Sequence, residues 1–277
     1  MKKTFRKILC LCFLAVFLAS TSLLVRQMIY NRSGADAYSH AHALASVSQS
    51  RNRNRHATEP TEPVQEETTP PEPVWIPAPV ENDPVMEQMA GIDLAALRAE
   101  NPDVLGWIRI PDTKIDYPLM RGDDNEYYLH HTWNRQPNTM GSIFLECRNN
   151  PNLADYNTII YGHNMANGTM FAQLHRYAEK GFRENHPFVY ILSDAGVYRY
   201  EVFSAYRAEI DSPVYALSFR QEESRVQLVG HALENSRIDT GIVPEKTDRI
   251  LTLSTCSGAG YTNRWVVHAR LKMVEIL

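Results

Sequence analysis

The pattern of apolar and polar residues divides the chain into three regions, and the first is an apolar run. Residues 8–25 are almost continuously apolar, interrupted only by Ser20, Thr21 and Ser22. Such a run is about long enough to cross the hydrocarbon core of a bilayer. Basic residues precede it and are expected to stay in the cytoplasm: Lys2, Lys3, Arg6 and Lys7. We therefore expect residues 1–30 to form a cytoplasmic tip and an uncleaved single-pass anchor in the cell membrane, with the remainder extracellular. A cleaved signal peptide is the alternative.

The second region, residues 31–85, is polar. It contains a segment rich in Ser, Ala and His, a basic patch at residues 51–55, and many Thr, Glu and Pro residues between Glu59 and Pro79. This composition buries too little apolar surface to fold. We expect a disordered linker, stiffened by its prolines, that separates the anchor from a domain at residues 86–277.

The third region, residues 86–277, carries short runs with the period-2 alternation and β-branched residues typical of strands. Turn-forming residues separate these runs. Many short strands at close spacing predict a mainly β domain, either a barrel or a sandwich. The strand-like runs are residues 104–110, 115–119, 141–145, 158–161, 188–192, 197–205, 249–255 and 264–271.

Helical spacing precedes the strand pattern once and interrupts it twice. Apolar residues between Met86 and Leu97 predict a helical cap that ends at Asn101-Pro102. A short amphipathic face follows at residues 170–178. A longer one, with apolar residues at 219–233, opens with Ser218 and Gln221, the spacing of a capping box.

Charge and cysteine content narrow the function classes. The formal net charge of -4 provides no general basic field, so nucleic acid is not an expected partner. Two of the four cysteines lie in the apolar run, and no zinc-ligand spacing is present, so no metal site is expected. Cys147 and Cys256 remain, and the sequence leaves open a bridge between them.

Cys256 and Arg264 are the first candidates for chemistry. Cys256 ends an apolar strand-like run beside a loop of small residues, and Arg264 begins the next run. If the two strands pair antiparallel, period-2 alternation puts both side chains on one face near the same end. A permanently charged donor beside a thiolate favours the anion and stabilises a tetrahedral oxyanion. Alone, Cys256 is also typical of a buried, inert cysteine and Arg264 of a surface arginine.

His163 is the third candidate. It follows the apolar run Ile159-Ile160-Tyr161 and a glycine, at a predicted strand end where an imidazole can reach substrate. Histidine transfers protons near neutral pH because its unperturbed pKa is about 6.5. A structural histidine is the plainer interpretation of this residue alone.

Taken together, these three motifs resemble the signature of the sortase family, and further blocks resemble class B sortases over about residues 86–277. The signature is carried by Thr252-Leu253-Ser254-Thr255-Cys256, by Arg264 and by Tyr161-Gly162-His163-Asn164-Met165. The class B blocks are NPDVLGWIRIPDTKIDYP at 101–118, DNEYYL at 124–129, GSIFL at 141–145, TIIYGHNMANGTM at 158–170 and VVHARL at 266–271.

The resemblance implies a fold and a site. The fold is an eight-stranded sortase β-barrel with an N-terminal helical cap and a long helix inserted between strands 6 and 7. The implied catalytic residues are Cys256, His163 and Arg264, with no metal or organic cofactor. The implied substrate contacts are Ser254, Thr255, Asn125 and Leu129. Some class B members carry an acidic residue just after the cysteine, and this chain has Ser257-Gly258 there.

The implied function is that of a cysteine transpeptidase at the surface of a Gram-positive cell. It would cleave a C-terminal sorting motif after Thr in secreted proteins. The acyl group would pass to an amine of the peptidoglycan cross-bridge or of a pilin. Two alternatives stay open: a thiol hydrolase of secreted peptides, and a non-catalytic, membrane-anchored wall-binding module.

Overall fold

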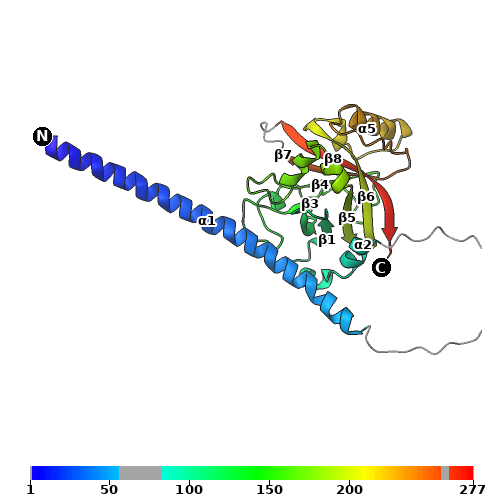
Figure 1. Cartoon of the computed structure of the whole chain (residues 1–277), viewed down its shortest axis with the longest axis horizontal. Coiled ribbons are helices and arrows are strands. Elements are labelled where there is room, and N and C mark those ends of the chain that lie inside the picture. The colour runs from blue at the N-terminus through cyan, green and yellow to red at the C-terminus, as the bar shows by residue number, and fades with distance from the viewer. Residues whose placement is uncertain (1, 56–82, 257–261, 277) are drawn as a thin grey trace, which may run out of the picture.

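The computed structural model describes residues 2–55, 83–256 and 262–276, and its centre is a closed barrel of eight strands (Figure 1). Around the barrel the strands follow the order β1-β2-β3-β4-β7-β8-β6-β5. Their bounds are β1 Val104–Arg109, β2 Asp116–Met120, β3 Ile143–Leu145, β4 Asn157–Tyr161, β5 Phe188–Ser193, β6 Gly196–Glu209, β7 Ile250–Cys256 and β8 Asn263–Glu275.

Two of the strand pairs are parallel, and both flank the short strand pair β3-β4. β2 pairs with β3 and β4 pairs with β7 in parallel, whereas the other six neighbours in the barrel are antiparallel. Each strand-like run of the sequence corresponds to one observed strand. The predicted mainly β fold with eight strands is confirmed.

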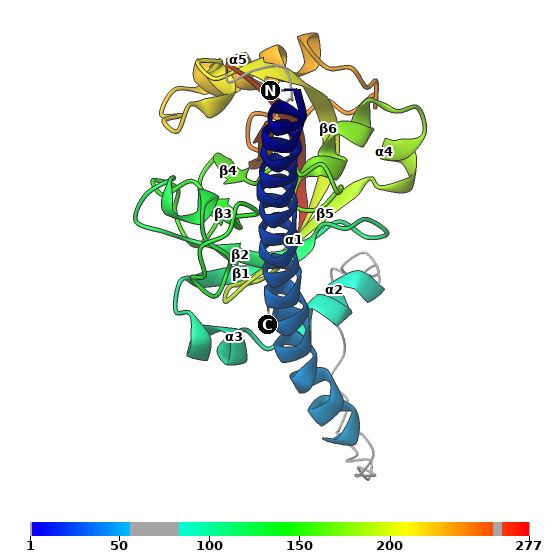
Figure 2. The ribbon, with the colours of Figure 1, turned by 90° about the vertical axis from the view of Figure 1, so that its left-hand side faces the viewer.

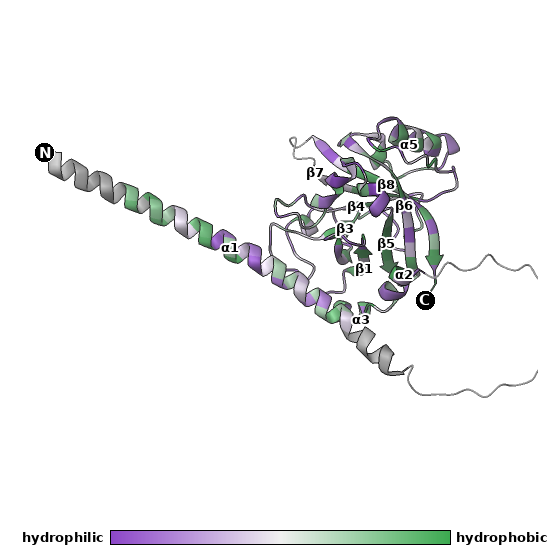
Figure 3. Ribbon diagram, in the orientation of Figure 1, coloured by the Kyte–Doolittle hydropathy of each residue, from purple (hydrophilic) through white to green (hydrophobic). Residues whose placement is uncertain are grey.

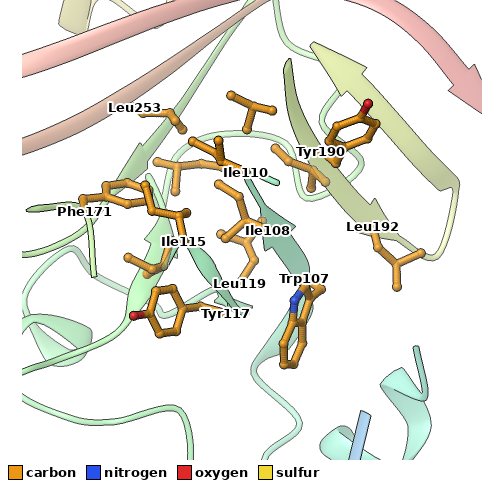
Figure 4. Packing of buried hydrophobic residues seen from close by; sticks show 14 of the residues in the cluster. Trp107, Ile108, Ile110, Ile115, Tyr117, Leu119, Phe171, Tyr190, Leu192 and Leu253 are labelled. Carbon is orange, nitrogen blue, oxygen red and sulfur yellow. The ribbon is translucent and has the colours of Figure 1, made fainter. Parts of the chain in front are cut away.

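The barrel interior is filled by apolar side chains from alternating strand positions. Figure 4 shows Ile108 and Leu119 in one group with Phe171 and Leu253, whereas Trp107, next to Ile108 in β1, lies apart from them; all five are buried. Burial of each such side chain contributes roughly 1.5–3 kcal/mol. The interior is therefore a packed core, and any chemistry takes place at a rim.

The remaining helices lie between or before the strands. Asp83 caps the first cap helix by accepting hydrogen bonds from the Val85 and Met86 amides. The helix predicted between strands 6 and 7 is present as α5, but Gln221 is its N-cap without a side-chain hydrogen bond, so the predicted capping box is wrong. The bounds are α2 Pro84–Ala90, α3 Leu94–Glu100, η1 Tyr127–Leu129, η2 Ala172–Ala178, α4 Phe182–Asn185, η3 Pro213–Tyr215 and α5 Glu222–Glu234.

A single long helix, α1 (Lys2–Arg55), precedes the barrel and crosses one side of it (Figures 1 and 2). Its residues 37–45 contribute Ala37, Tyr38, Ala41 and Ala45 to the core cluster of the barrel. Because α1 runs to Arg55, residues 31–55 are helical, in contrast to the disordered linker that we expected for residues 31–85. Residues 56–82 lie outside the described residues, so the boundary at residue 85 stays a prediction.

The membrane anchor predicted from residues 1–30 requires a correction. Among the residues that the structure describes, no helix is apolar over a sufficient length to cross a membrane. The predicted single-pass anchor, and the cell-membrane and extracellular localisation that depended on it, are wrong on this finding. Polar residues at 20–22 divide the apolar run, and Arg26 and Arg32 follow within the same helix. Figure 3 shows hydrophobic residues along α1 giving way to a mixture with hydrophilic ones.

Candidate active site

The three predicted catalytic residues belong to strand ends that meet at one rim of the barrel. β4 and β7 run parallel, with Tyr161 beside Ser254, so that His163 follows the end of β4 where Cys256 ends β7. β7 and β8 are antiparallel, and Cys256 lies directly opposite Arg264. Opposed residues of an antiparallel pair share a face and have Cα atoms about 5 Å apart. The register thus brings a thiol-bearing residue, a guanidinium-bearing residue and an imidazole to the same edge.

The imidazole of His163 is held by a backbone carbonyl. Its Nε2 lies 2.7 Å from the Leu129 oxygen. Because a carbonyl only accepts, Nε2 carries the hydrogen, and in the neutral ring Nδ1 is the atom available to accept or donate a proton. The half-buried ring is thus oriented with a known nitrogen for proton transfer.

Two glycines allow this placement of His163. A Cβ at Gly162 would lie 2.4 Å from Ile143 Cδ1, closer than any side chain tolerates. Gly141 has φ of +57°, and a Cβ there would lie 3.0 Å from His163 Cδ2. The Gly141 backbone therefore packs directly against the imidazole. The Phe171 amide, which donates to the His163 carbonyl at 2.9 Å, fixes the other side of the turn.

Arg264 begins β8 between its two neighbours in the sheet. It is opposite Cys256 on β7 and opposite Ala208 on β6. The side chain is half-buried, and Nη1 donates to the Asn263 carbonyl at 3.1 Å. A half-buried guanidinium interacts more strongly with a nearby anion than an exposed one does. This position suits stabilisation of a thiolate or an oxyanion next to Cys256.

A buried carboxylate, Glu146, supports the same rim and was missed by sequence reasoning. Its side chain accepts hydrogen bonds from Asn125 Nδ2 at 2.8 Å and from the Tyr161 hydroxyl at 3.1 Å, and Arg148 Nε lies 2.6 Å away. Burial raises the pKa of Glu146, but the Arg148 ion pair and the Asn125 hydrogen bond outweigh it and leave the pKa lowered. Glu146 stays ionised and ties β3 to β4. The sequence signal was a lone acidic residue directly after an apolar strand.

The four predicted substrate contacts, Asn125, Leu129, Ser254 and Thr255, differ in the hydrogen bonds that they already make. Asn125 already uses both ends of its amide, since its Oδ1 accepts from the Cys147 amide at 2.9 Å and its Nδ2 binds Glu146. Leu129 provides the carbonyl that holds His163. Leu129 lies at the rim beside His163, and Ser254 and Thr255 directly precede Cys256. These contacts test no substrate role, so the four assignments stay predictions.

Ser254 and Thr255 are both buried just before Cys256. Ser254 Oγ lies 2.9 Å from the Tyr215 hydroxyl of η3, within the segment between β6 and β7. Thr255 Oγ1 is buried without a hydrogen-bond partner among the described residues. Removal of the Ser254 hydroxyl should therefore lower the stability of the fold, whereas removal of the Thr255 hydroxyl should not.

Cys147 is a free cysteine, so the bridge to Cys256 that the sequence left open is not formed. Burial and the neighbouring Glu146 carboxylate raise the pKa of the Cys147 thiol. Less of it is therefore ionised at neutral pH, and the thiolate is the nucleophilic form. Cys147 is a poor nucleophile beside the rim. Ser257-Gly258, the positions where some class B members carry an acid, lie outside the described residues.

A barrel of this topology with a cysteine, an arginine and a histidine at strand ends defines a family. The model of the sortase domain matches residues 108–272, more than half of the chain. The chain belongs to the sortase family. Members of this family are cysteine transpeptidases, and this chain is an enzyme of that type.

Known relatives narrow the class to B. The chain is 38% identical to sortase B of Listeria monocytogenes over 164 residues, which is 59% of this chain and 67% of the relative. It is 33% identical to sortase B of Staphylococcus aureus over 182 residues, or 65% and 75% of the two chains. The predicted class B resemblance is confirmed.

Solved structures agree with this fold. The Staphylococcus aureus sortase B-substrate complex has a TM-score of 0.62 at 31% identity, covering 69% of this chain and 87% of that one. Clostridium perfringens sortase B has a TM-score of 0.61 at 34% identity, with 65% and 100% covered. The predicted barrel, with its helical cap and the helix between strands 6 and 7, is confirmed.

Proposed function

We propose that this enzyme cleaves a C-terminal sorting motif after Thr and transfers the acyl group to an amine of the peptidoglycan cross-bridge or of a pilin. The observation that carries the proposal is the register that puts Cys256 opposite Arg264 while His163 follows the adjacent strand end. Thiol, guanidinium and imidazole at one rim are the parts that acyl transfer needs.

In the proposed reaction the Cys256 thiolate attacks the carbonyl carbon of the Thr residue. A carbon–sulfur bond forms, and the oxygen carries the negative charge of the tetrahedral intermediate. Arg264 stabilises this charge from the opposite strand. When the peptide bond breaks, the leaving amine takes a proton from the histidine, and the acyl group remains as a thioester.

His163 supplies and recovers the proton through Nδ1. Protonation of the ring leaves the Nε2 hydrogen bond to Leu129 unchanged, because Nε2 carries a hydrogen in both charge states. The ring therefore keeps its orientation throughout the cycle. In the second half, Nδ1 accepts a proton from the incoming amine, which attacks the thioester and releases Cys256.

A peptide library tests this proposal. Purified full-length enzyme is incubated with peptides varied at each position around a central Thr, together with glycyl, lysyl or diaminopimelyl amines. We expect cleavage after Thr and a product mass equal to the acyl fragment joined to one amine class. Products of hydrolysis alone in every amine would instead identify a thiol hydrolase. Absence of cleavage with an unreactive Cys256 would indicate a binding module, and either result would overturn the proposal.

A further inference from the structure

The docked part of α1 contacts a loop that precedes β3 and packs against His163. The Trp133 indole donates to the Ala37 carbonyl at 2.7 Å, and Asn138 Nδ2 donates to the Tyr30 carbonyl at 2.8 Å. Trp133 and Asn138 both belong to residues 130–142, which we call the histidine-side loop because its Gly141 packs against the His163 ring. α1 and this loop are therefore fastened to each other through side chain to backbone hydrogen bonds.

Tyr38 is the deepest of these contacts. It is 5% exposed and belongs to the core cluster of the barrel. Its hydroxyl donates to the Gly141 carbonyl at 2.5 Å and lies 3.3 Å from Ser142 Oγ. Burial raises the pKa of Tyr38, so the hydroxyl remains a donor at any physiological pH. A residue of α1 thus fixes the backbone of the glycine that packs on the imidazole.

Tyr38 is also linked, through Tyr117, to the loop that follows His163 and contains Met170. It packs edge-on against Tyr117 with ring centroids 5.2 Å apart. The Tyr117 hydroxyl accepts a hydrogen bond from the Met170 amide at 3.1 Å. Met170 has a φ of +54° and pairs with Asn164, the residue after His163. Tyr38 therefore contacts both loops that confine the imidazole, one directly and one through Tyr117.

We propose that Tyr38 is a positioning residue for His163: its hydroxyl fixes Gly141 so that the imidazole keeps its Nε2 hydrogen bond to Leu129 and presents Nδ1 to the reaction. The proposal rests on the proposed transpeptidase function for its kinetic consequence, but its structural part concerns the orientation of one ring. Docking of α1 then contributes to catalysis although the three proposed catalytic residues all lie outside α1.

The test compares Tyr38→Phe with Tyr177→Phe in the full-length chain. Tyr177 is matched because its buried hydroxyl also donates to a backbone carbonyl, that of His186 at 2.8 Å. Each variant loses one buried hydrogen bond, so both should lose similar thermal stability. We expect kcat of Tyr38→Phe to fall about fivefold with KM within about twofold, which corresponds to about 1 kcal/mol. Tyr177→Phe should keep the kcat of the parent.

A second readout does not depend on turnover. Nitrogen-15 NMR of the imidazole reports which ring nitrogen carries the hydrogen. We expect His163 to show the Nε2–H form in the parent and in Tyr177→Phe, and a mixture of tautomers or a broadened signal in Tyr38→Phe. If the parent processes no sorting peptide, the proposed function fails, while this spectrum still decides whether Tyr38 orients His163.

A third variant protects the test against a misfolded Tyr38→Phe. Ala41 is fully buried in the same interface, one helical turn from Tyr38. Ala41→Glu places an unpaired charge there and should loosen α1 while the Tyr38 side chain is unchanged. We expect the same kcat loss and the same change at His163. Parental kcat and an unchanged His163 spectrum in folded Tyr38→Phe would overturn the proposal, as would equal kcat losses in Tyr38→Phe and Tyr177→Phe.

Discussion

Strands β4, β7 and β8 carry two pairs of polar residues, one at the rim and one in the core, and the two pairs differ in burial and in hydrogen bonding. At one end Cys256 lies opposite Arg264, and four residues down the same strand Thr252 lies opposite His268. Both pairs fall on the same face because side chains alternate with a period of two. The first pair lies at a rim where the loops begin, whereas the second is wholly buried.

The buried end is a closed hydrogen-bond network. The Thr252 hydroxyl donates to Asn157 Oδ1 at 2.7 Å, so it accepts from His268 Nδ1 at 3.0 Å. His268 Nε2 then accepts from the Tyr206 hydroxyl at 3.3 Å. Burial, reinforced by nearby His231, lowers the pKa of His268 to about 3. Both nitrogens are occupied and the ring stays neutral.

His163 differs from His268 because, within the part of the chain that the structure describes, only one of its ring nitrogens has a hydrogen-bond partner. One of its nitrogens is held by Leu129, and the ring is only half-buried. In the proposed mechanism, His163 can carry a proton because it follows a strand end at the rim and because, among the described residues, only its Nε2 has a hydrogen-bond partner. Changes at the rim should therefore alter rate with little effect on stability, and changes at the buried end should do the reverse.

The largest effect is expected for Cys256→Ala. Without the thiol no thioester can form, so transfer should fall to the uncatalysed background. The melting temperature should change little, since the substitution removes one atom at the end of a strand. Kinetics with the best peptide of the library and thermal unfolding measure the two quantities. Retained transfer would show that the rim does not act through Cys256.

Arg264→Lys should have the next largest effect. An ammonium keeps the positive charge but not the planar fork of donors. Loss of one oxyanion donor costs about 10² to 10³ in rate, and we expect kcat to fall within that range. Steady-state kinetics give kcat, and circular dichroism checks the fold. A Lys variant with parental kcat would mean that Arg264 acts only as a distant charge.

Thr252→Val and Thr255→Val form a matched pair that separates the two ends by stability. Thr252→Val breaks the hydrogen bonds to Asn157 and His268 and should lower the free energy of unfolding by about 2–3 kcal/mol. Thr255 Oγ1 has no hydrogen-bond partner among the described residues, so its removal should be neutral or stabilising. Denaturant unfolding of both variants measures the difference. Equal losses would contradict the network.

The smallest expected effect is a change in pH dependence. His268 is neutral in the fold and has an unfolded pKa of about 6.5. Its neutral form is fully stabilising above that pH, and stability is lost as the pH falls from about 6.5 toward about 3, because the unfolded chain binds the proton first. His268→Gln should remove about 2 kcal/mol of the loss between about pH 7 and about pH 5.

Urea unfolding at several pH values measures this slope. His130→Gln, at an exposed histidine, is the control and should leave the slope unchanged. A His268→Gln slope equal to that of the parent would contradict the neutral, buried state of His268.

The eight strands could be predicted from sequence because each is a short run of apolar and β-branched residues between turn-forming residues. Burial itself alternates little, since most residues of β2, β4, β5 and β6 are buried on both faces. The rim could be predicted too, since Cys256 and Arg264 fall on matching faces of adjacent strands. The pairing of β4 with β7 could not be predicted from the residue pattern, because residues 161 and 254 are far apart in sequence and their parallel register depends on closure of the barrel.

Two features of the site escaped sequence reasoning for different reasons. The α1 contact is made by alanines and one tyrosine at helical spacing, and such small residues give little hydrophobic signal within a polar segment. For Asn125, the resemblance indicated a substrate contact, but only the structure shows that Glu146 and the Cys147 amide already occupy its amide group.

Trapping of the thioester on a defined cysteine tests the central claim most directly. The full-length enzyme is incubated with a Thr-containing sorting peptide without amine, and the intact mass and peptide map are recorded. Cys147 serves as an internal control, because it is a free thiol whose pKa is raised. We predict an acyl adduct on Cys256 alone that disappears when an amine is added. Absence of an adduct under turnover conditions, or an adduct on Cys147, would contradict the account.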